Sequence, residues 1–275
     1  MYKIEGDKVI FDEKFNDVLT DDILNEISKY PKIELGWNFN QLIDNLPQGL
    51  KELYIGFKFN QPVDNLPHGL IKLKLGEKFN QPIEKLPQEL NKLVLRWNFN
   101  QPIDNLPQGL EVLNLWGNFN QPIDNLPQGL KVLEINGNFN QPMNNLPQGL
   151  KVLKLGNNFN HIIDNLPRGL TELYLWGNFN YPIDNLPQEL KILRIECFFN
   201  QPINNLPQGL KELDTFVYFN QPLDFLPSSL EELTIKNEEY SHDLLNLPNN
   251  LKKLTIPFEY KHNVLLPPNC EKIEI

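Results

Sequence analysis

The sequence predicts a solenoid, in which every turn of the chain adds one short strand to a parallel sheet. Three observations lead to this prediction. A Phe-Asn pair returns every 20 residues, ten times in all, from Phe39-Asn40 to Phe219-Asn220. Leucines recur at a fixed spacing between these pairs, and prolines recur twice in most turns. Because a period this short lets each repeat contact only its neighbours, one continuous array is expected.

The strand of each turn is predicted from its leucines. In one turn, Leu110, Leu113 and Leu115 have the spacing L-x-x-L-x-L, the signature of a leucine-rich repeat, whose strand lines the inside of a horseshoe. The alternation places the leucines in the core and Asn114 and Trp116 on the open face. The fold class is therefore a leucine-rich-repeat-like solenoid, a thin curved horseshoe. About twelve parallel strands are expected, at positions such as 53–55, 113–115 and 193–195.

The outer side of each turn is predicted to be extended or polyproline-like. Pro122 and Pro127 stand in the representative turn, and equivalent prolines follow in most others. Proline fixes φ and removes a hydrogen-bond donor, so a helix of useful length does not fit there. Helix is expected almost only in residues 20–30.

Two invariant positions are predicted to stabilise the stack of turns. Phe119, Phe139 and Phe159 are expected to form part of a continuous aromatic spine, with rings about 4.5–7 Å apart. The Asn that follows each Phe is expected to be a buried ladder residue that pairs backbone groups left free by the bend after the strand. The ladder consists of Asn60, Asn80, Asn100, Asn120, Asn140, Asn160 and Asn180.

Three segments are expected: an N-terminal cap in 1–31, regular repeats in 32–235, and degenerate repeats in 236–275 that act as a second cap. The first segment contains a hairpin turn at Gly6-Asp7 and a short helix with Thr20 as its N-cap. In the last segment the spacing slips by one residue and Phe-Asn is lost. The final strand at Ile273–Ile275 would leave an uncovered edge, blunted by charged residues.

Composition excludes several classes of partner. The net charge is −10 and the pI about 5, which argues against a nucleic-acid backbone and an anionic membrane surface as partners. No apolar run approaches the ~20 residues of a membrane span, and no signal-peptide core is visible. The two cysteines, Cys197 and Cys270, lie in distant repeats, which favours a reducing, cytoplasmic setting.

No catalytic residue, metal site or cofactor is expected, and the chain is interpreted as a non-enzyme. The four histidines do not have metal-ligand spacing, and no phosphate loop or nucleophile elbow is present. A row of aspartates that includes Asp104 and Asp124 is compatible with calcium sites. The favoured interpretation is that each Asp forms a turn by bonding its own backbone.

The segment Phe-Asn-Gln-Pro-Ile, followed by L-P-x-x-L-x-x-L-x-L, resembles the FNIP repeat over 32–235. This relative of leucine-rich repeats is typical of social amoebae and of giant viruses that infect amoebae. The resemblance implies a cytoplasmic protein-binding solenoid. It leaves the source open, and a protein encoded by a virus would act in the host cytoplasm. Family repeats are more often about two residues longer than these.

Family members often begin with an F-box-like segment, and residues 21–27 are similar to the first helix of an F-box. Only one helix fits before Phe39, which favours a capping helix. The resemblance therefore leaves one alternative, a substrate-recognition subunit of a ubiquitin ligase that lacks a full F-box.

The open face is predicted to bind a protein partner. Its central turns carry apolar residues where the outer turns carry charges, and aromatic anchors with a polar rim are typical of protein-binding sites. The alternative is that outward positions tolerate any residue. A self-associating structural protein, monomeric or a weak homodimer through the terminal edge, is the second functional alternative. The expected partner-binding residues are Val94, Val112, Trp116, Val132, Val152, Tyr174, Trp176 and Ile192.

Overall fold

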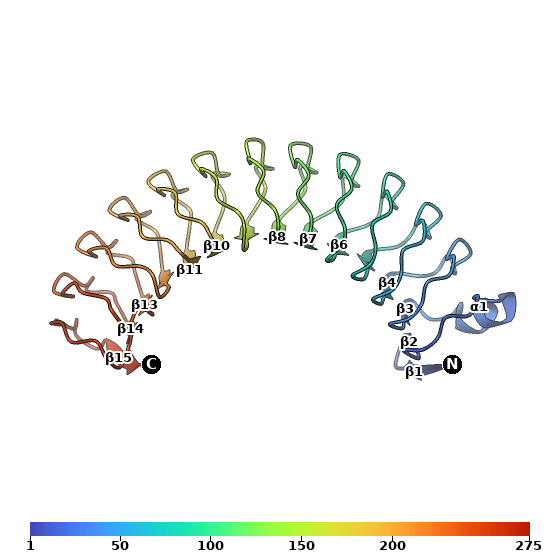
Figure 1. Cartoon of the computed structure of the whole chain (residues 1–275), viewed down its shortest axis with the longest axis horizontal. Coiled ribbons are helices and arrows are strands. Elements are labelled where there is room, and N and C mark those ends of the chain that lie inside the picture. The colour runs from blue at the N-terminus through green and yellow to red at the C-terminus, as the bar shows by residue number, and fades with distance from the viewer. The chain divides into compact units, whose positions relative to one another are not determined.

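The computed structural model describes residues 1–275, which form two compact units, Met1–Phe139 and Asn140–Ile275. Each unit is a solenoid with about 20 residues per turn, and Figure 1 shows one strand per turn with the loops on the opposite side. This division does not bear on the segment boundaries predicted after residues 31 and 235, which remain a prediction.

The first unit contains eight strands and one helix. Its elements are β1 (Tyr2–Glu5), β2 (Lys8–Phe11), α1 (Asp21–Ile27), β3 (Lys32–Leu35), β4 (Glu52–Ile55), β5 (Lys72–Lys74), β6 (Lys92–Leu95), β7 (Val112–Gly117) and β8 (Val132–Gly137). The first two strands form an antiparallel hairpin, and every later strand pairs in parallel with the one before it. The register advances by one repeat per strand, so Leu93 pairs with Leu113 and Leu113 with Leu133.

The second unit continues the same pattern. Its strands are β9 (Val152–Leu155), β10 (Glu172–Gly177), β11 (Ile192–Cys197), β12 (Glu212–Thr215), β13 (Glu232–Ile235), β14 (Lys253–Ile256) and β15 (Glu271–Glu274). These strands pair in parallel in chain order. The prediction of one parallel strand per turn is confirmed, and the strands β3 to β15 give thirteen turns rather than twelve.

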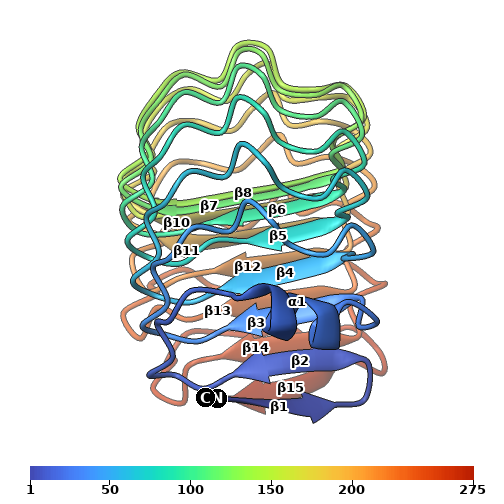
Figure 2. The ribbon, with the colours of Figure 1, turned by 90° about the vertical axis from the view of Figure 1, so that its right-hand side faces the viewer.

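The predicted cap elements form at the expected residues. Gly6 takes φ +61° in the hairpin turn, where a side chain would be strained. The Thr20 hydroxyl accepts a hydrogen bond from the Ile23 N–H at the start of α1. Leu24 and Ile27 are buried, and α1 stands beside β2 and β3 on the side where later turns place a loop (Figure 2). At seven residues, this one helix of the chain is far too short to cross a membrane.

The aromatic spine forms the centre of each unit. Successive rings from Phe39 to Phe139 lie 6.0 to 6.3 Å apart, with nearly parallel planes. In the degenerate turns Tyr240 and Tyr260 replace Phe and extend the stack that begins at Phe159. The ring spacing exceeds the ~4.8 Å between strands, so the turns of each unit diverge from the sheet outward and the sheet lies on the inner side of the curve.

The Asn residues link each turn to the next through a repeated pair of hydrogen bonds. Asn80 Oδ1 accepts from the Asn100 N–H at 2.9 Å, and the Asn80 carbonyl accepts from Gln101 Nε2 at 3.2 Å. The first such acceptor is Asn16, within the cap. Contrary to expectation, the Asn side chains are half-buried or exposed, because the bend they bond lies at the rim of the solenoid rather than in its core.

We expect Asn100→Ala to lower the free energy of unfolding by about 1 kcal/mol, because it removes the acceptor of the Asn120 N–H and of Gln121 Nε2. Asp104→Ala, in the same turn, removes only the exposed acceptor of Asn125 Nδ2 and should cost about 0.5 kcal/mol or less. Urea unfolding of both variants measures the difference. A larger loss for Asp104→Ala would show that the aspartate row, not the Asn ladder, joins the turns.

Candidate functional site

The strand face of each unit is the surface formed by the outward side chains of its strands. In the first unit, Val112 pairs with Val132 and Trp116 with Asn136. Val112 and Val132 are half-buried, whereas Val94 is only 9% exposed and contributes little to the surface. Trp116 is half-buried, and the Arg96 guanidinium lies 4.8 Å from its ring centroid.

In the second unit, the predicted residues lie among charges. Lys154 Nζ is 4.8 Å and Arg194 Cζ 5.7 Å from the Tyr174 ring centroid. The Tyr174 hydroxyl donates to Glu172, and burial, followed by this hydrogen bond, raises the pKa of Tyr174. The pair formed with Trp176, 6.0 Å away, is thus a half-buried aromatic centre with a charged rim.

Each unit carries its own part of the predicted surface. The first unit brings Val112 and Val132 together, and the second brings Tyr174 and Trp176 together. Val152 and Ile192 both pair with Glu172, so a charge separates them. The role of all these residues in partner binding stays a prediction.

The aspartate row uses its oxygens for contacts between turns. Asp44 Oδ1 accepts from Asn65 Nδ2 at 3.2 Å, and Asp104 Oδ1 accepts from Asn125 Nδ2 at 2.9 Å. The expected hydrogen bonds from each Asp to its own backbone are thus replaced by bonds to the next turn. No group of three or more His, Cys, Asp or Glu side chains is arranged to hold a metal ion.

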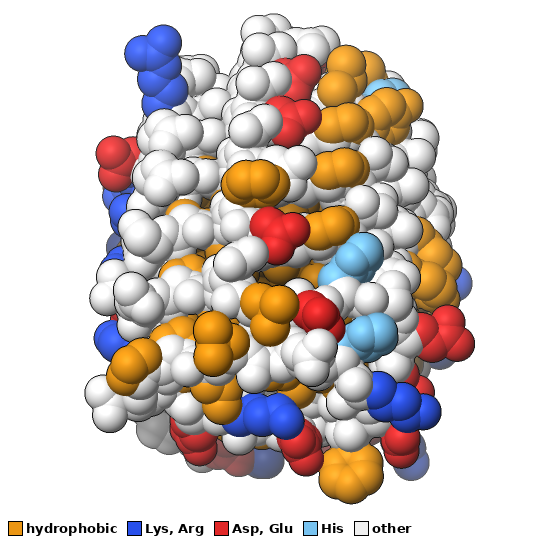
Figure 3. All heavy atoms as spheres, turned by 90° about the vertical axis from the view of Figure 1, so that its left-hand side faces the viewer, with side chains coloured by type: hydrophobic (Ala, Val, Ile, Leu, Met, Phe, Trp, Pro, Cys, Tyr) orange, Lys and Arg blue, Asp and Glu red, His pale blue; other side chains and the backbone are white.

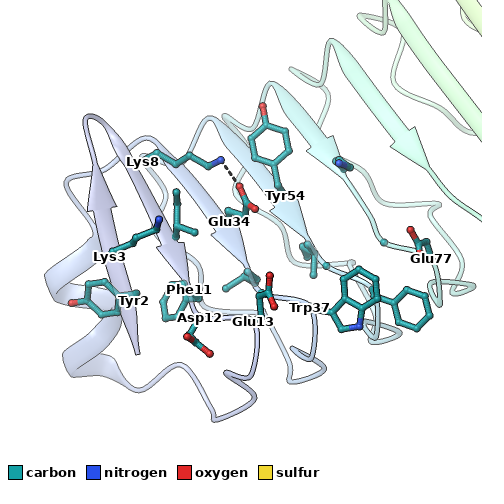
Figure 4. Close-up of a pocket in the computed structure, with 18 of the residues that line it drawn as sticks. Tyr2, Lys3, Lys8, Phe11, Asp12, Glu13, Glu34, Trp37, Tyr54 and Glu77 are labelled. Carbon is teal, nitrogen blue, oxygen red and sulfur yellow. Dashed lines mark hydrogen bonds and ion pairs between the residues drawn. The ribbon is translucent and has the colours of Figure 1, made fainter.

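A groove in the first unit was not predicted from the sequence. This first-unit groove has a volume of about 900 Å³ and lies over β1 to β5, with Arg96 just after β6 also in its lining (Figure 4). Its floor contains Gly36, Gly56 and Gly76, where an added Cβ would lie only 1.9 to 2.5 Å from a backbone oxygen of the preceding turn. The glycines therefore allow the turns to stack closely at the floor of the groove. Their 20-residue spacing was the one signal of the groove in the sequence.

The walls of the groove are aromatic and charged. Trp37 stacks on Phe57 with ring centroids 4.7 Å apart, and the Trp37 side chain is 52% exposed. On the opposite wall, Lys8 forms an ion pair with Glu34 and lies 5.3 Å from the Tyr54 ring centroid. Figure 4 shows Glu34 and Tyr54 on one side of the groove and Trp37 on the other.

Two cations meet near one end of the groove. Lys74 makes no hydrogen bond or ion pair, and burial and the nearby Arg96 charge both lower its pKa. Arg96 is 3.8 Å from Glu77, and its Nε is buried without a hydrogen-bond partner. Lys74 and Arg96 can attract an anionic group, and Trp37 can pack against a flat apolar group. The groove offers no nucleophile.

We expect the two cysteines to differ in reactivity. Cys197 is 3% exposed, and burial raises the pKa of its thiol to about 12. Because the thiolate is the reactive form, iodoacetamide at pH 8 should leave Cys197 unmodified in the native protein. Cys270 is half-buried and should be modified first. Mass spectrometry after timed labelling measures both, with urea-unfolded protein as the control. Equal native rates would contradict the placement of Cys197.

These features define the class: a thin leucine-rich-repeat solenoid, a fold that is typically a non-enzymatic binding scaffold. The family model described as FNIP Repeat matches residues 39–78, 59–93, 79–118, 119–158, 143–176, 159–198 and 199–238. The chain belongs to the FNIP repeat family. A comparison with curated proteins finds no match.

Solved structures agree with this assignment. CroV588, a circular leucine-rich-repeat protein from a giant virus, is 32% identical with a TM-score of 0.78. The match covers 99% of this chain and 50% of CroV588, so the chain spans about half the length of that protein. The Leptospira interrogans leucine-rich-repeat protein LIC12759 is 18% identical with a TM-score of 0.56, over 92% of this chain and 86% of its own. TLR13 in a complex with ssRNA13 is 16% identical with a TM-score of 0.58, and the match covers 92% of this chain and 48% of the TLR13 chain. The last two likenesses concern the fold alone.

Proposed function

We propose that this chain is a non-enzymatic scaffold that holds a protein partner against its strand face. The observation that carries the proposal is the Tyr174–Trp176 pair, a half-buried aromatic centre bordered by Glu172, Lys154 and Arg194. Aromatic anchors inside a polar rim are characteristic of protein-binding surfaces. The similarity to CroV588, a giant-virus protein, supports a viral source. On that source, the partner would be a protein of the host cytoplasm.

The helix α1 favours this proposal over a ligase subunit. Its buried residues, Leu24 and Ile27, form an apolar face that is already used inside the first unit. A helix that recruits other proteins would need a free apolar face.

The scaffold proposal is tested by capture of partners from an amoebal lysate with the immobilised protein. The comparison is with the double variant Trp116→Ala with Trp176→Ala.

Self-association is the second candidate function, favoured by apolar side chains exposed in the last turns. Phe258 is 73%, Leu265 65% and Ile275 59% exposed. Figure 3, which views the protein from the left-hand side of Figure 1, shows several hydrophobic side chains on that surface. A second copy could cover these side chains, and β15 pairs with β14 alone. The edge is short and bears Glu271, so the resulting dimer would be weak.

We expect light scattering to show a monomer at micromolar concentration, with a weak dimer at the highest concentrations. Phe258→Lys with Leu265→Lys should abolish the dimer, because charges replace the exposed apolar surface. Val18→Lys, an exposed change in the cap, is the control. A tight dimer that survives the double change would move the interface to the strand face.

A further inference from the structure

The first-unit groove has unpaired charges of opposite sign near its two ends. Lys74, on β5, makes no hydrogen bond or ion pair, and Glu13, just after β2, makes no side-chain contact of either kind. We propose that the groove binds an extended peptide segment that carries a carboxylate and, about five residues away, a cationic side chain. This site does not depend on the proposed function, because the groove belongs to the first unit, whereas the Tyr174–Trp176 pair that carries the proposed function belongs to the second.

The carboxylate belongs at the cationic end. Burial, and after it the nearby positive charge of Arg96, lowers the pKa of Lys74, so the two cations repel each other. Glu77 lies 3.8 Å from Arg96 Nη1, a long contact that leaves Nε without a partner. A carboxylate between the two cations would pair with both and relieve their repulsion. Arg96 is held in place for this role by its contact with Trp116.

The cationic side chain belongs beside Glu13, which Figure 4 shows next to Asp12, between the cap residues Tyr2 and Lys3 and the Trp37 ring. From β2 to β5 there are three strand spacings of ~4.8 Å, about 14 Å in all. Lys74 is in register with Ile10 through Tyr54 and Glu34, and Glu13 lies three residues further along the strand direction, about 10 Å at ~3.3 Å per residue. The direct separation is therefore about 17 Å, which an extended chain spans in about five residues. The spacing of the two charges in the peptide follows from the spacing of the strands.

The middle of the groove accepts the apolar part of the segment. The floor at Gly36, Gly56 and Gly76 consists of backbone that is packed against the backbone of the preceding turn. Trp37, stacked on Phe57 and 52% exposed, offers a flat ring to a side chain between the two charges. An aromatic residue in the peptide would stack there.

The charge balance of the lining favours a peptide over a nucleic acid. The groove is lined by as many cations as anions, since Lys3, Lys8, Lys74 and Arg96 face Asp12, Glu13, Glu34 and Glu77. A phosphate backbone is bound by a surplus of cations. The charged side chains of the lining balance, with Lys74 and Arg96 toward one end and Glu13 toward the other. A peptide segment with one charge of each sign matches this arrangement.

The probe is a fluorescein-labelled peptide Lys-Ala-Phe-Ala-Ala-Glu, with blocked ends, whose binding to the full chain is measured by fluorescence anisotropy. We expect saturable binding that weakens at least fivefold when the peptide's Glu is replaced by Gln. Lys74→Gln should bind both peptides alike, because the partner of the carboxylate is gone. Lys92→Gln is the matched control: it removes one positive charge on β6, outside the groove, and should keep the full preference for Glu.

A second pair of variants tests the other end. Glu13→Gln should remove the preference for the peptide's Lys over Gln and keep the preference for Glu. Circular-dichroism melting confirms that each variant is folded. Absence of saturable binding would overturn the proposal. So would a Lys74→Gln variant that still prefers the Glu peptide over the Gln peptide, or a Lys92→Gln variant that loses this preference to the same extent as Lys74→Gln. Displacement of the peptide by a single-stranded RNA oligonucleotide at equal concentration would identify a nucleic-acid groove instead. A failed lysate capture would leave these results unaffected.

Discussion

Phe99→Ala is expected to lower the free energy of unfolding by about 3–5 kcal/mol, the range for removing a large aromatic side chain from a packed core. The Phe99 ring is 1% exposed and lies 6.1 Å from both Phe79 and Phe119. Its removal takes away two ring contacts and leaves a cavity between three successive turns. Because each turn is stabilised by its neighbours, the loss also weakens the stacking of the turns on either side.

Urea unfolding measures this loss, provided that the slope of the unfolding free energy against urea concentration is the same in both proteins. Gln108→Ala, an exposed change in the same turn, is the control and should remain within about 0.5 kcal/mol of the wild type. A loss for Phe99→Ala as small as that of the control would mean that the leucine core, not the aromatic spine, holds the turns together. Phe99→Leu should fall between the two, because it keeps much of the buried area.

The double change Trp116→Ala with Trp176→Ala is expected to reduce capture of the partner at least tenfold, which corresponds to about 1.4 kcal/mol of binding free energy. Buried tryptophans are common anchors of protein interfaces, often with 2 kcal/mol or more each. The ring of Trp116 also supports Arg96, and Trp176 Nε1 donates to Glu196 at 3.2 Å. The fold should therefore lose about 1 kcal/mol at each position and remain intact at the temperature of the assay.

The control for this experiment is Asp124→Ala with Lys131→Ala, two exposed changes on the outer side of one turn. It should capture the partner as the wild type does. Single tryptophan variants show which unit carries the anchor, because Trp116 belongs to the first unit and Trp176 to the second. Normal capture by a badly destabilised double variant would assign the tryptophans a structural role. The outer loops around Asp124 and Lys131 would then become the candidate site.

The sequence by itself determined the secondary structure and the spine of this protein. The positions of Leu113 and Leu115 placed them in β7, and the invariant Phe placed a stacked ring in every regular turn. A strict period leaves no freedom in the register, because each residue must lie beside the one 20 positions away. The same reasoning placed the helix after Thr20, where an N-cap and two acidic residues stand together.

The tertiary structure decided the contacts that the repeat pattern does not specify. Tyr240 continues the spine although the Phe-Asn pair is lost, since any ring of similar shape can stack there. Arg96 lies 4.8 Å from the Trp116 ring centroid, a contact that the repeat pattern does not predict. The groove near Lys74 depends on which charges pair across turns and which positions lack a side chain. Periodicity fixes which residues are neighbours in the sheet, but long polar side chains choose among several partners within reach, and that choice is made only when the turns are packed together.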